Sequence, residues 1–155
     1  MNIKMAWKKI IPYNKLNSKQ KENYNFQKVS SILADYGFNT LRLSDDWQGA
    51  DFIAAHKDGE TFLKVQLKSR LTFSKKYLGK DIWVCFPHKK DEEIEPDWYL
   101  YPHDEFKNKL NGTMDFQETD SWKKQGGYST NKPNKKVLSL LEKYYKLSFV
   151  PTNIS

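Results

Sequence analysis

Three polar side chains near the middle of the sequence have the types and spacing to bind a metal ion and activate water. Asp51 and Gln66 carry oxygen atoms of the kind that Mg²⁺ or Mn²⁺ binds, and the backbone carbonyl of Leu67 could supply a third. Lys68, two residues after Gln66, has an amine that could orient or deprotonate a water molecule beside the ion. These groups would suit metal-assisted hydrolysis of a phosphodiester bond if the fold brings them together.

A predicted β-hairpin does bring them together. Segments 51–57 and 60–69 have strand-like sequences, and Asp58-Gly59 between them favours a two-residue type I′ turn. With this turn, Asp51 and Gln66 lie equally far from the turn and face each other, with Cβ atoms about 5 Å apart. The sequence therefore predicts that a carboxylate and an amide share one face of the hairpin.

The second strand of the hairpin has one apolar and one polar face. Lys68 points to the same side as Gln66, because alternate side chains of a strand share a face. Lys64 is on that face too, farther from the proposed metal. The alternative is an ordinary solvated strand face, which hairpins often have. The opposite, core-facing side carries Leu63, Val65 and Leu67.

A helix is expected before the hairpin, from about residue 18 to 36. Asn17 and Gln20 have the spacing of a capping box, and apolar residues recur at helical intervals up to Gly37. Glu22 lies on the apolar stripe near the start of this helix, so its carboxylate should point towards the sheet and could join the metal site. Favourable placement near the helix dipole explains Glu22 equally well.

A resemblance to the PD-(D/E)xK nucleases, the restriction-endonuclease-like superfamily, is carried by the hairpin sequence GADFIAAHKDGETFLKVQLK. Asp51 matches the aspartate of the family, Gln66 its variable acidic position and Lys68 its lysine. Glu22 matches an acidic residue often found on the preceding helix. The resemblance implies a core of helix, three-stranded antiparallel meander, helix and strand, and residues 18–68 follow the first four elements in order.

Three features depart from the family pattern. Ala50 stands where a proline often precedes the aspartate, and Gln66 replaces the commoner glutamate, as in the Gln-x-Lys members of the family. The link LTFSKKYLGK, residues 71–80, is short for a helical crossover to a parallel strand. The second helix of the family would then be very short, or the next strand pairs differently, or the link forms a DNA-facing loop.

The resemblance implies a Mg²⁺- or Mn²⁺-dependent endonuclease that cuts DNA. Asp51, Gln66, the Leu67 carbonyl and Glu22 would hold the metal, and Lys68 would serve the attacking water. A homodimer would allow both strands of a duplex to be cut, and RNA is an open alternative to DNA. Two other readings are a catalytically inactive nucleic-acid-binding module with the same fold and a protein-interaction domain with an accidental motif.

The distribution of charge favours a nucleic-acid partner. The net charge is +7, and the segments 61–80 and 121–136 are strongly basic, whereas residues 91–105 contain acids and no base. Basic clusters of this kind attract phosphate backbones, although solubilising lysines would give the same composition. The residues expected to contact nucleic acid are Arg70, Lys75, Lys76, Lys80, Lys123 and Lys124.

The remaining features favour a single cytoplasmic α/β domain spanning residues 1–155. The expected fold is a restriction-endonuclease-like core at about 18–101, with an N-terminal helix, a mixed sheet of about five strands and flanking helices. A basic, irregular segment at 111–135, in which Trp122 could stack on an exposed base, should precede a C-terminal helix at about 136–146. No apolar run is long enough to cross a membrane, and a single cysteine excludes an internal disulfide.

Overall fold

A computed structural model describes residues 9–91 and 93–148 and, apart from Asp46 and Trp47, their side chains. The helices are α1 (Ser18–Asp35), α2 (His103–Lys109), α3 (Asp120–Gln125) and α4 (Lys135–Tyr144), with 3-10 turns η2 (Tyr13–Lys15), η3 (Lys75–Tyr77) and η4 (Phe116–Glu118). The strands are β1 (Phe38–Trp47), β2 (Ala50–His56), β3 (Phe62–Leu67), β4 (Leu71–Ser74), β5 (Ile82–His88), β6 (Asp97–Pro102), β7 (Gly127–Thr130) and β8 (Lys146–Leu147). None of these helices has the length and apolarity needed to cross a membrane.

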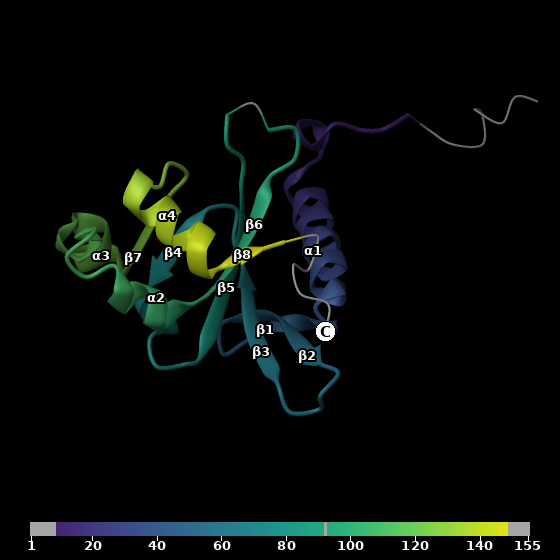
Figure 1. Ribbon diagram of the computed structural model, residues 1–155, viewed down its shortest axis with the longest axis horizontal. Helices are drawn as coiled ribbons and strands as arrows, with labels where there is room; N and C mark the ends of the chain where they lie inside the picture. The colour runs from purple at the N-terminus through teal and green to yellow at the C-terminus, as the bar shows by residue number, and fades with distance from the viewer. Residues whose placement is uncertain (1–8, 92, 149–155) are drawn as a thin grey trace, which may run out of the picture.

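Six strands form one mixed sheet in the order β1-β2-β3-β5-β6-β8. Neighbouring strands are antiparallel except β3 and β5, which are parallel. The prediction of an α/β fold with an N-terminal helix and a mixed sheet is therefore confirmed, with six strands in place of about five (Figure 1). α1 followed by the meander β1–β3 also matches the order of elements that the family resemblance implies.

Helix α1 covers one face of the sheet and begins and ends close to the predicted residues. Its capping box is formed, since the Gln20 N–H donates to Asn17 Oδ1 at 2.8 Å and the Asn17 N–H donates to Gln20 Oε1 at 2.9 Å. One stripe of the helix is buried against β2, β3 and β5. The side chains in this part of the core include Val29, Ile32, Leu33, Phe52, Ala54, Val65 and Cys85.

The β2–β3 hairpin has the predicted register but a different turn. Phe52 pairs with Val65, so Asp51 and Gln66 are the next facing positions. The loop spans residues 57–60, so the predicted two-residue type I′ turn at Asp58-Gly59 is wrong. A two-residue and a four-residue loop centred on the same peptide bond give the same pairing, which is why the register prediction is nevertheless confirmed.

The connection from β3 to the parallel strand β5 contains no α-helix. It consists of β4, which leaves the main sheet, and the three-residue 3-10 turn η3. β4 pairs antiparallel with β7 and forms a separate two-stranded sheet. The sequence predicted that residues 111–135 are irregular. This is wrong for part of the segment, because it contains η4, α3 and β7.

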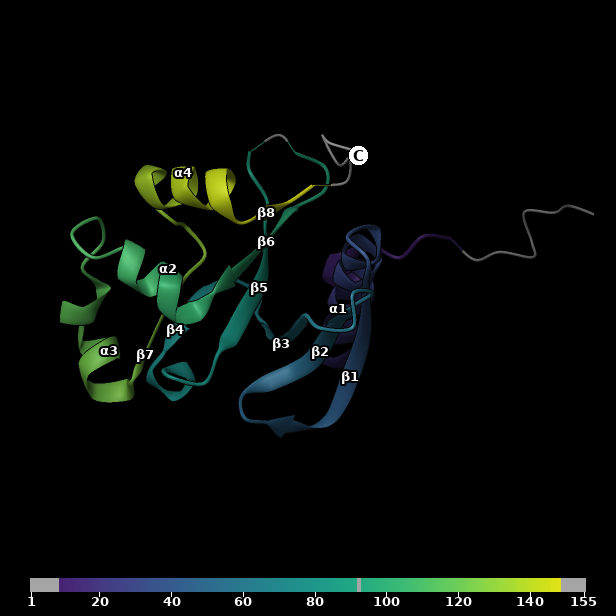
Figure 2. The same ribbon diagram turned by 60° about the horizontal axis from the view of Figure 1, so that its bottom comes forward.

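The β4–β7 sheet and helices α2, α3 and α4 lie on the opposite side of the main sheet from α1 (Figure 2). They enclose a second, aromatic-rich part of the core against β5 and β6. β5 and β6 are therefore buried on both faces, whereas β2 and β3 are only half buried. The largest side chains of this second core include Phe73, Tyr77, Phe86, Tyr99, Tyr101, Phe106 and Phe116.

A charged network attaches α4 to the sheet. Glu142 of α4 accepts a hydrogen bond of 2.6 Å from the Tyr99 hydroxyl and pairs with Lys90 and, at 3.3 Å, with Lys146. Burial raises the pKa of the Glu142 carboxyl, but the hydrogen bonds from Lys90, Tyr99 and Lys146 outweigh burial and lower it to about 2. The folded state is therefore stabilised by the charged form of Glu142.

Replacing Glu142 by Gln is expected to lower the free energy of unfolding by about 1–2 kcal/mol near pH 7, because it removes a hydrogen-bonded charge. The folded-state pKa lies below the ordinary value of 4.5, so this contribution is complete above pH 4.5 and is lost as the pH falls towards 2. Urea denaturation of the wild type and Glu142→Gln should therefore show a smaller difference near pH 3.

The matched control is Glu118→Gln, which breaks the exposed ion pair between Glu118 and Lys123. Exposed pairs contribute at most about 1 kcal/mol, so this variant should lose less than Glu142→Gln. Equal losses in the two variants would contradict a stabilising role for the Glu142 network.

Candidate active site

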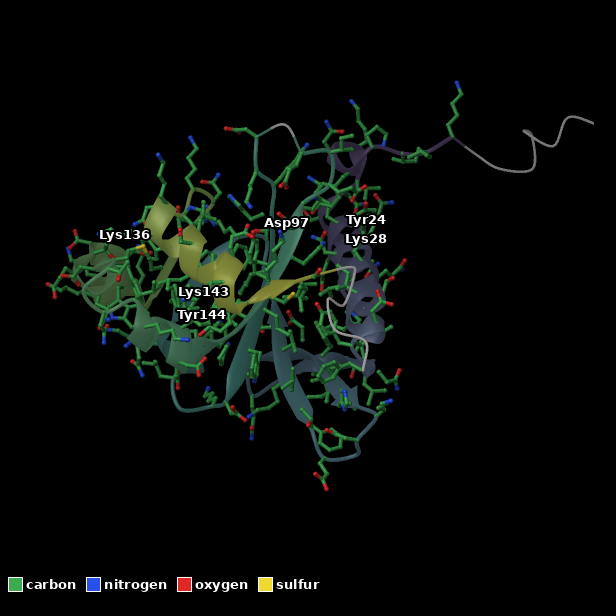
Figure 3. All side chains as sticks on the ribbon, viewed as in Figure 1. Tyr24, Lys28, Asp97, Lys136, Lys143 and Tyr144 are labelled. Carbon is green, nitrogen blue, oxygen red and sulfur yellow. The ribbon has the colours of Figure 1, made fainter. Side chains whose placement is uncertain are left out.

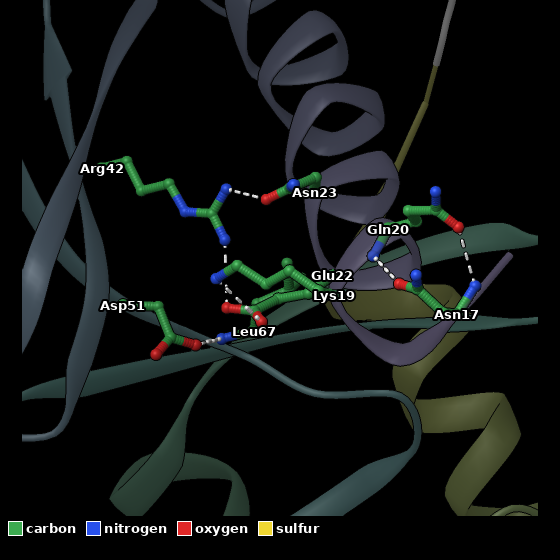
Figure 4. A network of polar contacts seen from close by, with 8 residues as sticks. All are labelled: Asn17, Lys19, Gln20, Glu22, Asn23, Arg42, Asp51 and Leu67. Carbon is green, nitrogen blue, oxygen red and sulfur yellow. Dashed lines mark hydrogen bonds and ion pairs between the residues drawn. The ribbon is translucent and has the colours of Figure 1, made fainter.

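Asp51 lies at the start of β2, directly after a tight turn. The turn residues Gln48 and Gly49 have φ angles of 53° and 88°, so positive φ angles typical of a type I′ turn occur here, between β1 and β2. The half-buried Asp51 side chain reaches across to β3, where Oδ2 accepts a hydrogen bond of 2.9 Å from the Leu67 N–H (Figure 4). The carboxylate is thus held against the last residue of β3.

Gln66 points away from α1, as the alternation of β3 predicts. Its neighbour on the parallel strand β5 is Val84, which belongs to the core on the side opposite α1. The Gln66 Oε1 atom is buried and has no hydrogen-bond partner among the residues that the structure describes. A buried acceptor without a donor costs about 1–3 kcal/mol, so a bound cation would offset a penalty at this atom.

The oxygen atoms at this strand end fit a hard cation. The Asp51 carboxylate and Gln66 Oε1 belong to facing positions, and the Leu67 carbonyl points to the same edge of β3 as the Leu67 N–H that binds Asp51. Mg²⁺ and Mn²⁺ accept carboxylate, amide and backbone oxygens as ligands. No group of three or more His, Cys, Asp or Glu side chains in the described part of the chain is placed to hold a metal ion, so a cation here would depend on the amide and backbone oxygens.

Lys68 is the first residue after β3. Its N–H donates to the Cys85 carbonyl at 2.8 Å, which continues the pairing of β3 with β5 by one residue. Its Nζ lies 6.0 Å from the centroid of the Tyr77 ring, and the side chain lines a groove on the β4–β7 sheet. Asp51 and Gln66 are facing positions of the hairpin and Lys68 follows two residues after Gln66, and a common site for the three stays a prediction.

Glu22 lies in the first turns of α1, and 55% of its side chain is exposed. Its carboxylate accepts from Arg42 Nη2 at 3.0 Å and pairs with Lys19 at 3.4 Å (Figure 4). Because Arg42 belongs to β1, Glu22 does point towards the sheet. Its described partners are these two cations, and a role for Glu22 in metal binding stays a prediction.

The basic residues expected to contact nucleic acid fall into two groups. Arg70, Lys75, Lys76 and Lys80 are all exposed and follow β3 in the crossover to β5. Lys123 and Lys124 instead pair with acids of their own segment, Glu118 at 2.8 Å and Asp120 at 3.8 Å. The crossover is therefore the more strongly cationic of the two segments near Lys68.

Trp122 is not available for base stacking. Only 6% of its side chain is exposed, and its ring packs edge to face against Phe116 with centroids 5.2 Å apart. The hypothesis that Trp122 stacks on an exposed base is wrong, because the ring completes the second core. Composition alone did not reveal this burial, since the surrounding residues are mostly lysine, glycine and serine.

A buried histidine anchors the crossover beside Lys68, and the sequence analysis missed it. His103 Nε2 accepts a hydrogen bond of 3.0 Å from the Ser74 N–H, so the ring proton lies on Nδ1, 2.7 Å from Asp104 Oδ1. Asp104 Oδ2 also accepts from the Gly79 N–H at 2.8 Å. The His103–Asp104 pair thus holds both ends of the segment that carries η3. The only sequence signal was a His-Asp pair at a helix start, which does not identify its distant partners.

The chain has a distant likeness to a solved protein structure. No family model matches the sequence, and no curated protein matches it. Among solved structures, the chain is similar to a Holliday junction resolvase from the archaeal hyperthermophile Archaeoglobus fulgidus, with 16% sequence identity and a TM-score of 0.40. The superposition covers 54% of this chain and 74% of the resolvase chain. A likeness of this quality does not by itself assign a family or an activity.

Acid is expected to destabilise the fold through His103. Burial lowers the pKa of this imidazole below its ordinary 6.5, although the hydrogen bond to Asp104 opposes the change. The unfolded chain therefore takes up a proton that the folded chain excludes, and the free energy of unfolding should decrease below pH 6.5 by up to about 1.4 kcal/mol per pH unit.

Urea denaturation between about pH 8 and pH 5 measures this dependence. His103→Gln keeps an acceptor for the Ser74 N–H but cannot titrate, so its stability should change less with pH. His88→Gln, at a partly exposed histidine of β5, is the control and should behave like the wild type. The same pH dependence in His103→Gln as in the wild type would contradict this role.

Proposed function

We propose that this protein is a divalent-metal-dependent nuclease that hydrolyses DNA phosphodiester bonds at the junction of β2 and β3. The observation that carries the proposal is the Asp51 carboxylate, which is hydrogen-bonded to the end of β3, next to the buried Gln66 Oε1 that has no hydrogen-bond partner among the described residues. Lys68 follows directly after β3 and would add an amine at this position. The PD-(D/E)xK-like order of these residues along the hairpin supports the same conclusion.

Asp51, Gln66 and the Leu67 carbonyl would hold the metal ion, with Glu22 as a further carboxylate at the start of α1. When bound, the ion would polarise the phosphate and lower the pKa of a nearby water. The hydrogen bond from the Leu67 N–H fixes the Oδ2 atom of Asp51 and thereby the orientation of the whole carboxylate. This arrangement would preorganise the carboxylate before DNA binds.

Lys68 would act on the attacking water or on the phosphate. Hydrolysis forms a bond from the water oxygen to phosphorus and breaks one P–O ester bond, leaving a phosphate end and a hydroxyl end. The water loses a proton and the departing oxygen gains one. Lys68 in its neutral form would accept the proton of the water, and in its charged form would stabilise the negative charge on the phosphate.

A DNA-binding module without turnover is the second candidate. It is favoured by the amide of Gln66, which supplies one negative charge fewer than a carboxylate, and by the lack of an acid cluster among the described residues. The two candidates share the fold and the basic crossover. They differ only in whether cleavage accompanies binding.

Cleavage of supercoiled plasmid and of single-stranded DNA, with Mg²⁺, with Mn²⁺ or with a chelator, tests the proposal. The wild type should cleave only with metal, and Asp51→Asn and Lys68→Ala should each reduce the rate by about 100-fold or more, because each removes a group that acts in the transition state. The controls are Asp35→Asn and Lys28→Ala on α1, which should cleave like the wild type.

Cleavage that persists in both Asp51→Asn and Lys68→Ala would contradict the assigned site. Binding of DNA by the wild type without cleavage under either metal would favour the binding module. Equal loss of activity in the α1 control variants would mean that charge in general, rather than this site, determines the rate.

Gln66→Glu tests the metal site without measuring activity. A carboxylate at this buried position should destabilise the metal-free protein, because an unpaired charge is costly to bury. It should also bind Mn²⁺ more tightly by adding a negative charge. Thermal unfolding with and without Mn²⁺ should therefore give a larger metal-induced rise in Tm for Gln66→Glu than for the wild type. No rise in either protein would contradict metal binding at Gln66.

A further inference from the structure

A groove of about 240 Å³ lies on the outer face of the β4–β7 sheet, beside the candidate active site. β4, η3, β7 and α3 form it, and Lys68 lines it at the end nearest β3. β4 leaves the main sheet within the crossover from β3 to β5, so the groove adjoins the strand end where Asp51 and Gln66 meet. A ligand in this groove would contact the same lysine as a phosphate at the active site.

The floor of the groove consists of small polar residues and a glycine, because alternate residues of β4 and β7 share one face. Thr72 of β4 pairs with Ser129 of β7, and Ser74 pairs with Gly127. Directly paired residues share a face, so three hydroxyl-bearing side chains and a glycine form this surface. The intervening residues of β4 are fully buried in the second core. The floor is therefore polar and has no bulky side chain. Thr72 Oγ1 donates to the Arg70 carbonyl at 2.8 Å and Ser74 Oγ to the Gly126 carbonyl at 3.4 Å, which leaves Ser129, among the described residues of the floor, to donate its hydroxyl to a ligand.

The wall formed by η3 carries positive charge. Lys76 Nζ lies 5.3 Å from the centroid of the Tyr77 ring, and Lys68 Nζ lies 6.0 Å from the same centroid. No Asp or Glu is among the residues that line the groove. Two ammonium groups beside a hydroxyl-rich floor, without a carboxylate, suit a ligand with repeated anionic oxygens.

This wall is fixed in place before any ligand binds. Tyr77 is 1% exposed and packs beneath the β1–β2 turn, where a Cβ atom on Gly49 would lie 3.2 Å from its ring. His103 and Asp104 hold the two ends of the η3 segment. A preformed wall loses little conformational entropy on binding. Its contact with the turn before Asp51 fixes the position of the groove relative to the candidate active site.

We propose that this groove binds the phosphodiester backbone of one DNA strand on one side of the cleaved bond, independently of base sequence. The inference rests on the proposed function for the identity of the ligand. Lys76 and Ser129 would contact phosphate oxygens, and Lys68 would join this contact to the active site. Backbone contacts of this kind position a strand without reading its bases.

Independence from base sequence follows from the packing of the aromatic rings around the groove, of which Phe73 and Tyr77 are buried and Tyr128 is partly exposed. Phe73 and Tyr77 are almost completely buried, and the Tyr128 ring stacks on Phe116 with centroids 5.3 Å apart. Base stacking on exposed aromatic side chains is the usual second source of affinity for single strands. Its absence from the floor and the η3 wall leaves charge and hydroxyl groups as the source of affinity.

Fluorescence anisotropy in the presence of a chelator tests the groove separately from catalysis. The probes are a labelled single strand of about twelve thymidines and an abasic strand of the same length. Lys76→Gln should weaken binding about three- to tenfold at low salt and reduce the slope of log affinity against log salt by about 1, as expected for one lost phosphate contact. The matched control is Lys28→Gln, an exposed lysine of α1 on the other side of the sheet (Figure 3).

The two strands should bind the wild type with affinities within about threefold of each other. Equal effects of Lys76→Gln and Lys28→Gln, or loss of binding by the abasic strand, would overturn the proposal. The same proteins are tested for cleavage with Mn²⁺. If the wild type binds DNA through Lys76 but does not cleave it, the proposed nuclease function is contradicted and the proposed groove is supported. If the wild type cleaves DNA and Lys76→Gln binds DNA normally, the nuclease function is supported and the groove is contradicted.

Discussion

The β2–β3 turn is the constraint on which the candidate site depends. Asp58 accepts hydrogen bonds from the Glu60 and Thr61 N–H groups, both at 2.8 Å, and from the Thr61 hydroxyl at 2.7 Å, and these bonds hold the pKa of its carboxyl well below the ordinary value. This turn sets the register that places Asp51 opposite Gln66. A slip of one residue would turn Gln66 and Lys68 into the apolar layer beneath α1, so the site requires this turn.

The two faces of the sheet explain where the site lies. α1 covers β2 and β3 on one face, and the second core covers β5 and β6 on the other. The second face of β2 and β3 is therefore only partly covered, and polar side chains are tolerated there. Because β4 begins three residues after Lys68 and lies outside the main sheet, its pairing with β7 builds a hydroxyl-rich surface beside this open face. One topological feature, a crossover without a helix, thus connects the candidate site and the groove.

Local signals predicted the first half of the fold and the facing positions of Asp51 and Gln66. The capping box marked the start of α1, and strand alternation with Asp58-Gly59 gave the hairpin register, although the turn is longer than expected. The pairing of β4 with β7 joins segments more than fifty residues apart, and neither strand has an alternating pattern strong enough to reveal it. For the same reason, the contact of His103 with Ser74 and the burial of Trp122 became apparent only from tertiary packing.

Paramagnetic broadening of backbone amide signals by Mn²⁺ tests the central claim most directly, because it locates the ion without requiring catalysis. In a ¹H–¹⁵N spectrum of the wild type, substoichiometric Mn²⁺ should first broaden the amides of Asp51, Gln66, Leu67 and Lys68, since these groups surround the proposed oxygen ligands. The acidic 93–97 segment, where Asp97 pairs with His88 at the C-terminal end of β5, should be affected only at higher metal concentration. Broadening that begins in 93–97 and spares Asp51 and Leu67 would contradict the account.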